Sequence, residues 1–280
     1  MRLSVTVTPA APSGAPILLR GDLRKNIALA AELGFDGVEL HLARASEVDG
    51  PDLLETCRAA GIAVSTIGTG GIFTRDGLQL ITDDREVRER CAARLQELID
   101  LGKVLRAAVI IGSARGSIPR PDRAAIYERR FLETLSRLAE YAGEKGVLLL
   151  IEAINRYETN YLNRAEDVLA MIAGAGYPNL QVHLDTFHMN IEEVSPADSI
   201  RRCGPALGHI HFADSNRRFP GAGHYSFTET IGALNDIGYN RWIALECLPL
   251  PDAVTAAREG LYQVRKMAAG AATDCQEEKN

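Results

Sequence analysis

Residues 165–185, AEDVLAMIAGAGYPNLQVHLD, contain the pattern that decides the fold: a helical segment, a glycine and a short strand. The first part is rich in alanine and ends at Gly176, and helices favour a left-handed glycine at that position. The closing run, LQVHLD, has the character expected of a strand buried in a parallel sheet. This segment therefore predicts one helix followed by one parallel strand.

The same module returns along the whole chain. DLRKNIALAAELG precedes FDGVEL, REVRERCAARLQELIDLG ends at Gly102 before AAVIIG, and FTETIGALNDIG precedes RWIALE. The expected strands cover 2–7, 35–40, 62–67, 107–112, 147–152, 180–185, 208–214 and 241–246, and a last helix lies near 252–269.

This alternation, at about 250 residues in all, is typical of a (β/α)8 TIM barrel. We predict one such α/β domain over 1–270, followed by a polar C-terminal tail, 271–280. A doubly wound open sheet is the alternative, but no G-x-G-x-x-G fingerprint follows the first strand.

The composition is that of a globular protein with room for a large core. The chain has 280 residues, 46% apolar and 24% charged, with a formal net charge of −6. No run of Lys or Arg could follow a phosphate backbone, so nucleic acid and membrane surfaces are poor candidates as partners. The five widely spaced cysteines favour free thiols in a reducing compartment. No stretch forms a signal peptide or a membrane span, so we expect a cytoplasmic protein.

Four neighbouring strands end in side chains that can bind a metal: Glu152, Asp185, His211 and Glu246. The chemistry of such barrels lies at the C-terminal ends of the strands. One carboxylate alone at a strand end is usually a solvated cap. Several carboxylates crowded at one rim repel each other unless a cation offsets them, so together they indicate a metal site.

The four side chains also indicate which metal and which chemistry. Two Glu, one Asp and one His without a thiolate favour Mn²⁺, with Co²⁺ or Mg²⁺ as alternatives. Such a metal acts as a Lewis acid and stabilises the enediolate that forms when a proton leaves the carbon next to a carbonyl. Glu152 and Glu246 stand about 135° apart around the predicted barrel. Two carboxylates on opposite faces of one carbon are what an epimerase needs.

The other titratable residues near these strand ends are expected to have lesser roles. His183 and His209 should lie one layer below the metal, as supporting or core residues. His188, in the loop after Asp185, could reach a substrate oxygen or lie at the surface. Glu39 ends the second strand and is expected at the rim rather than as a fifth ligand.

Several motifs resemble the xylose-isomerase-like sugar isomerase and epimerase superfamily. They are IEAINRYETNYLN (151–163), LDTFHMNIEE (184–193), HIHFADSNR (209–217), PGAGH (220–224) and ALE (244–246). Within the superfamily the chain resembles the ketose 3-epimerases of the D-tagatose 3-epimerase type. It is more similar still to the epimerases of 5-keto-L-gluconate, a keto sugar acid, over nearly its whole length, including GDLRK at 21–25 and ECLPLP at 246–251.

The resemblance implies a divalent-metal-dependent epimerase that interconverts 5-keto-L-gluconate and D-tagaturonate and forms a dimer or tetramer. It implies Glu152, Asp185, His211 and Glu246 as metal ligands, with Glu152 and Glu246 also as the catalytic acid/base pair. It further implies Glu158, His188 and Arg217 as substrate-binding residues.

The chain departs from the family pattern at His183, which is usually aliphatic, and at Ala153, where proline is common. A keto sugar acid would also need a cation for its carboxylate. Arg75, Arg115 and Arg217 are the candidates, and the first two could equally be solvated surface residues.

Other functions use the same residues. A ketose 3-epimerase acting on D-tagatose or D-psicose, or an aldose–ketose isomerase acting on hydroxypyruvate, would need the same metal and carboxylates. A non-catalytic sugar-binding protein would have no need for two opposed glutamates. The superfamily's DNA-repair endonuclease builds on further histidines, but IGTGG and IIGSARG, after the third and fourth strands, offer none.

Overall fold

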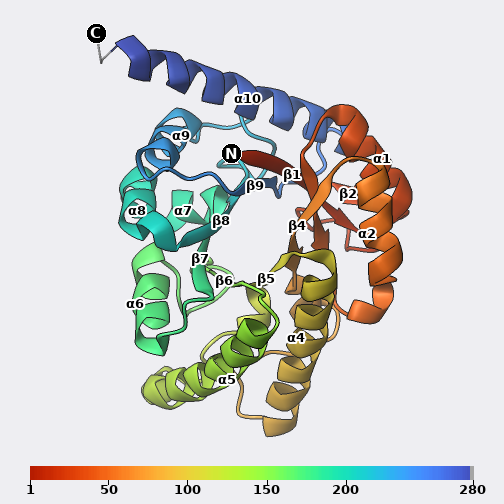
Figure 1. Cartoon of the computed structure of the whole chain (residues 1–280). Helices are drawn as coiled ribbons and strands as arrows, with labels where there is room; N and C mark the ends of the chain where they lie inside the picture. Colours follow the sequence, from red (N-terminus) through yellow and green to blue (C-terminus); the bar gives the residue numbers. More distant parts are fainter. Residues whose placement is uncertain (278–280) are drawn as a thin grey trace.

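Parallel strands close into a barrel around the centre of the molecule, and helices cover its outside (Figure 1). The computed structural model describes the backbone of residues 1–277 and the side chains of residues 1–270. In the described chain the strand order is β1-β3-β4-β5-β6-β7-β8-β9, and β9 pairs back onto β1. The strands are β1 Arg2–Thr8, β3 Gly37–His41, β4 Ala63–Gly68, β5 Ala108–Ile111, β6 Leu149–Glu152, β7 Leu180–Asp185, β8 Leu207–Phe212 and β9 Trp242–Leu245. The predicted single-domain (β/α)8 barrel is confirmed.

One short strand was not expected from the sequence. Strand β2, Leu19–Arg20, pairs with Val7 and Thr8 of β1, whereas β9 pairs with residues 2–5 of β1. The segment therefore adds to β1 near its C-terminal end, beyond the residues that β9 pairs with.

The helices follow the strands as the sequence pattern predicts. The longer ones are α1 Leu23–Leu33, α2 Gly50–Ala59, α4 Arg85–Leu105, α5 Ala124–Glu144, α6 Ala165–Ala175, α8 Pro196–Cys203, α9 Phe227–Asp236 and α10 Ala253–Glu277; α3 Gly70–Thr74 and α7 Thr186–Glu192 are short. Gly176 ends α6 in the left-handed conformation, as predicted.

Two predicted boundaries differ from the structure. Helix α4 does not end at Gly102 but continues to Leu105, and Arg106 takes the left-handed C-cap. Gly102 instead packs against Ala107 and Val109, where a Cβ would fit tightly. The predicted tail, 271–280, coincides in part with α10, which runs to Glu277, and its last three residues lie outside the described part.

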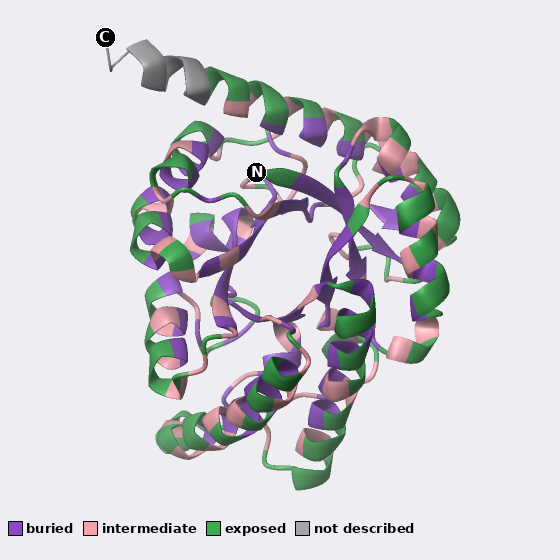
Figure 2. Ribbon diagram, in the orientation of Figure 1, coloured by how far each residue is buried: buried purple, intermediate pink, exposed green. Residues whose placement is uncertain are grey.

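The main apolar core lies between the strands and the helices, and the helices turn their exposed faces outward (Figure 2). The barrel interior is unusually polar by contrast, because such barrels are normally filled by Val, Ile and Leu. Its buried polar side chains include Ser4, Thr6, Glu39, Ser65, Thr66, His183, His209 and His211. Within the described residues, no helix is long and apolar enough to cross a membrane.

Candidate active site

Strand pairing brings three of the four predicted metal ligands together. Asp185 on β7 is in register with His211 on β8, and Glu152 is the last residue of the neighbouring strand β6. One ligand atom from each lies within 4.8 Å of the others, and all three residues are buried. Glu246 follows β9 directly, with Oε2 3.5 Å from Nδ1 of His211. All four predicted ligands thus stand at one rim.

The two glutamates line the same small cavity, of about 60 Å³, in different protonation states. Burial raises the pKa of Glu152 to about 8, and the charge of Glu246 adds to this effect. Burial also opposes the charge of Glu246, but His211 and Arg217 outweigh it and lower the pKa of Glu246 to about 2. Pairs of groups whose environments push their pKa values apart are typical of acid/base partners.

The residues at this rim fit a divalent cation. Asp185 caps α7 through Oδ1, which accepts the N–H of Phe187, whereas its buried Oδ2 has no hydrogen-bond partner among the described residues. Four buried carboxylates, Glu39, Glu152, Asp185 and Glu246, and the partly exposed Glu158 face two guanidinium groups, Arg115 and Arg217. The ionised carboxylates outnumber the guanidinium groups, and a divalent cation would offset this excess of negative charge, since buried charges must be paired.

His188 lies on helix α7 rather than in a loop, and it is buried, so the surface alternative is wrong. Its Nδ1 accepts a hydrogen bond from Nδ2 of Asn155 at 2.7 Å. Because Oδ1 of Asn155 accepts from the N–H of Tyr157, the amide orientation is fixed. The remaining His188 proton is therefore on Nε2, which lies 3.8 Å from Oε1 of Glu152. That N–H can donate to a substrate oxygen.

Arg217 connects the loop after β8 to the cavity. Its guanidinium donates to Oε1 of Glu158 at 2.9 Å, lies 3.5 Å from Oε2 of Glu246 and sits over the Phe187 ring. The backbone of Arg217 is left-handed, with φ 59°, a conformation that costs a non-glycine residue energy and often occurs at functional sites. The three predicted substrate-binding residues, Glu158, His188 and Arg217, thus line one cavity with the two glutamates.

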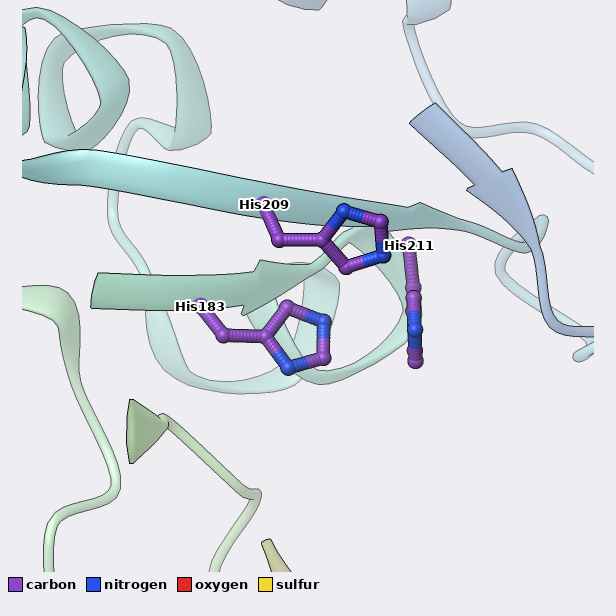
Figure 3. A group of neighbouring side chains, drawn as sticks. All are labelled: His183, His209 and His211. Carbon is purple, nitrogen blue, oxygen red and sulfur yellow. The ribbon is translucent and has the colours of Figure 1, made fainter. Parts of the chain in front are cut away.

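Glu39 was expected at the rim of the barrel, and the structure places it inside the barrel instead. It is fully buried inside the barrel, in contact with histidines on β3 and β8. His183 and His209 are in register with each other one layer below the pair Asp185 and His211, as predicted. The ring centroids of His183 and His211 are 4.1 Å apart, edge-on (Figure 3). Sequence reasoning missed Glu39 and Asn155 as parts of the site; for Asn155 the available signal was its place in the NRYET motif.

The two other arginines considered as partners of a substrate carboxylate, Arg75 and Arg115, differ in exposure. Arg115 is fully buried and donates to the carbonyl oxygens of Glu152 and Tyr161, at 2.7 and 2.9 Å, so the surface alternative is wrong for it. Arg75 is partly exposed and pairs with Glu47 at 2.7 Å. It lines a cavity of about 270 Å³ that Glu246, Arg217 and His41 also line.

Comparison with known proteins gives consistent matches. The family model described as a xylose isomerase-like TIM barrel matches residues 27–266. A D-psicose 3-epimerase of Agrobacterium fabrum is 35% identical, over 77% of this chain and 76% of its own length. An L-ribulose 3-epimerase of Mesorhizobium japonicum is 33% identical, over 79% and 73%. The solved structure of an L-ribulose 3-epimerase superposes with a TM-score of 0.84 at 26% identity, covering 99% of this chain and 98% of that one.

Proposed function

Since the chain belongs to the xylose isomerase-like TIM barrel family and is an isomerase of the epimerase type, we propose that it inverts the carbon next to the carbonyl of a keto sugar or keto sugar acid. The observation that carries this proposal is the pair of buried glutamates, Glu152 and Glu246, in one cavity with opposite protonation preferences.

The proposed metal site consists of Glu152, Asp185, His211 and Glu246, and its ligand chemistry favours Mn²⁺. A divalent cation bound there would act as a Lewis acid that stabilises negative charge developing on the substrate oxygens. Each glutamate would serve one face of the reacting carbon, one removing a proton and the other delivering one. His188 would donate Nε2–H to a substrate oxygen, and Arg217 and Glu158 would hold the sugar hydroxyls.

For the substrate we propose 5-keto-L-gluconate and D-tagaturonate. Two arginines, Arg75 and Arg217, line the same cavity as Glu246, and a substrate carboxylate needs such a cation. A second candidate is a ketose 3-epimerase of the D-psicose or D-tagatose type. The names of the relatives favour it, as does the apolar part of the cavity wall, which Ala10, Ala11 and Pro12 form.

Deuterium incorporation from D2O tests the reaction and the substrate together. The protein is loaded with Mn²⁺ and incubated with 5-keto-L-gluconate, D-tagatose, D-fructose or hydroxypyruvate, and the products are analysed by NMR. We expect deuterium next to the carbonyl with inversion there, fastest for the keto sugar acid. Faster turnover of a neutral ketose would move the assignment to a ketose 3-epimerase. Deuterium only at the terminal hydroxymethyl carbon beside the carbonyl, without inversion of a stereocentre, would indicate an aldose–ketose isomerase, and no exchange in any sugar would refute an epimerase.

A further inference from the structure

Glu39 is surrounded by three histidine rings and a threonine hydroxyl at the centre of the barrel. Oε1 lies 2.8 Å from Nε2 of His41 and 2.7 Å from Nε2 of His211. Oε2 lies 2.7 Å from Nε2 of His209 and also accepts the hydroxyl of Thr66. These contacts join β3 to β4 and β8 across the interior, and the Glu39 carboxylate is fully buried.

The Glu39 carboxylate determines the tautomers of the neighbouring histidines. An ionised carboxylate only accepts hydrogen bonds and offers about four lone-pair positions, two on each oxygen. Each oxygen of Glu39 has two neighbouring donor groups. A ring nitrogen without a proton would bring its negative partial charge to 2.7–2.8 Å from the negative oxygen, which is repulsive. His41, His209 and His211 therefore each carry a proton on Nε2.

For His211 the tautomer decides whether the ring nitrogen at the rim carries a proton or a free lone pair. Its Nε2 lies 2.7 Å from Oε1 of Glu39, an ion-pair contact without hydrogen-bond geometry, and its Nδ1 lies 3.5 Å from Oε2 of Glu246. We infer that Glu39 is a positioning residue: it holds the proton of His211 on Nε2 and so presents the lone pair of Nδ1 to the metal. The inference rests on the proposed metal site. Carboxylate–histidine–metal arrangements of this kind typically contribute 10- to 100-fold to metal affinity.

His183 packs against the side of the His211 ring and supports its orientation. It is fully buried on β7, and neither ring nitrogen has a hydrogen-bond partner among the described residues. Its ring meets His211 edge-on and His209 at 5.1 Å (Figure 3). Although the three rings could themselves hold an ion, a second divalent cation would leave the barrel interior with excess positive charge. The site therefore takes one ion, and His183 packs against its histidine ligand.

Long-range ¹H–¹⁵N NMR of the ¹⁵N-histidine-labelled protein loaded with Zn²⁺, a diamagnetic probe, tests the tautomers directly. We expect Nε2–H on His41, His209 and His211, with the metal on Nδ1 of His211. A metal on Nε2 of His211, or an Nδ1–H tautomer there, would overturn the inference. A spectrum in which Zn²⁺ shifts no histidine would instead refute the proposed metal site, so the two failures are distinguishable.

Two substitutions measure the contribution of Glu39. Glu39→Gln replaces one acceptor oxygen by an NH2 donor, so at least one histidine must change tautomer; we expect Mn²⁺ affinity, followed by EPR of the free ion, to fall 10- to 100-fold. Thr66→Val removes a donor from the same carboxylate but none of the histidines, and should keep both the tautomers and the affinity within about threefold.

Equal losses in both variants, or unchanged tautomers and affinity in Glu39→Gln, would contradict the positioning role. If Glu39→Gln does not fold, the spectrum of the unaltered protein still decides the question. Two bound equivalents of Zn²⁺, one of them lost in His183→Leu, would also overturn the inference, because Glu39 would then contact a second ion.

Discussion

The carboxylate of Glu152 lies directly against the backbone of Gly112. A Cβ at position 112 would overlap Oε2 of Glu152, so only glycine leaves room for this side chain. Gly112 follows β5, the strand beside β6, and its own backbone needs no left-handed angle. The glycine is thus required for space, and it determines where one of the two proposed proton-transferring groups stands.

Gly112→Ala is therefore expected to displace the Glu152 carboxylate. Misplacing a catalytic group by about 1 Å can cost about 100-fold in rate, and we expect kcat to fall by that order while substrate affinity changes little. Gly174→Ala is the matched control, because a Cβ there meets no atom within 4 Å and lies in helix α6. Steady-state kinetics would distinguish them; equal activity in the two variants would exclude the spatial role of Gly112.

Glu246→Gln separates the two proposed proton-transferring groups while keeping an oxygen ligand. We expect epimerisation to fall by about 100- to 10,000-fold, the usual contribution of an acid/base group. Glu152 should still exchange the proton on its own face with solvent, so deuterium should enter one epimer without inversion. Glu152→Gln should give the mirror result with the other epimer. Full activity in either variant would remove the two-base mechanism.

The barrel and the gathering of four acidic and imidazole side chains at its rim could be predicted because they depend on local patterns. Each helix–glycine–strand module specifies one βα unit, and the last residues of the strands then meet at one rim by topology alone. Glu152, Asp185, His211 and Glu246 each stand at or near a strand end in the sequence. Their approach needed no knowledge of side-chain packing.

Other parts of the site could not be read in this way, because they depend on contacts distant in sequence. Glu39 and His209 are 170 residues apart, and the sequence shows Glu39 only as an acidic residue near a strand end. Arg115 looked like a surface residue because its partners are main-chain carbonyls, which leave no trace in sequence. The buried His188 is hydrogen-bonded to Asn155, which belongs to the loop after β6.

Metal binding should release protons at neutral pH. In the metal-free protein, burial raises the pKa of Glu152 to about 8 and that of Asp185 to about 7, and Glu39 and Glu246 raise the pKa of His211 well above its usual value against the effect of burial. These three protons must leave before the side chains can act as ligands. Mn²⁺ titration at pH 7 with an indicator dye should show at least one proton released per ion, and Asp185→Asn should release fewer.

The same shifts set the pH dependence of stability without metal. The protons that folding retains on Glu152 and Asp185 make the metal-free protein less stable as pH rises, whereas the buried His183, His188 and His209, whose pKa values are lowered, oppose this below about pH 6.5. Between about pH 7 and 8 the opposing histidine effect has ended and the carboxyl effect remains, so stability should fall there. Mn²⁺ should therefore raise the Tm more at pH 8 than at pH 5.5. An equal or smaller shift at pH 8 would contradict the assigned protonation states.

Arg75 provides the test of a carboxylate-bearing substrate. Arg75 lines the cavity that Glu246 also lines, and its guanidinium pairs with Glu47, which also accepts the backbone N–H groups of Ala43 and Arg44. Arg75→Met removes the charge but keeps most of the apolar stem, and Glu47 keeps its backbone partners. A charge-assisted hydrogen bond contributes about 1.5–3 kcal/mol, so kcat/KM for 5-keto-L-gluconate should fall roughly 10- to 150-fold, mainly through KM.

Turnover of D-tagatose by the same variant should stay within about threefold, because a neutral ketose has no carboxylate for Arg75 to bind. Arg44→Met is the control, since Arg44 pairs with Asp76 at the surface and does not line the cavity. It should leave both substrates unaffected. Equal losses of kcat/KM for the acid and the neutral sugar in Arg75→Met would mean that Arg75 shapes the cavity without binding a substrate carboxylate. The substrate assignment would then move to a neutral ketose.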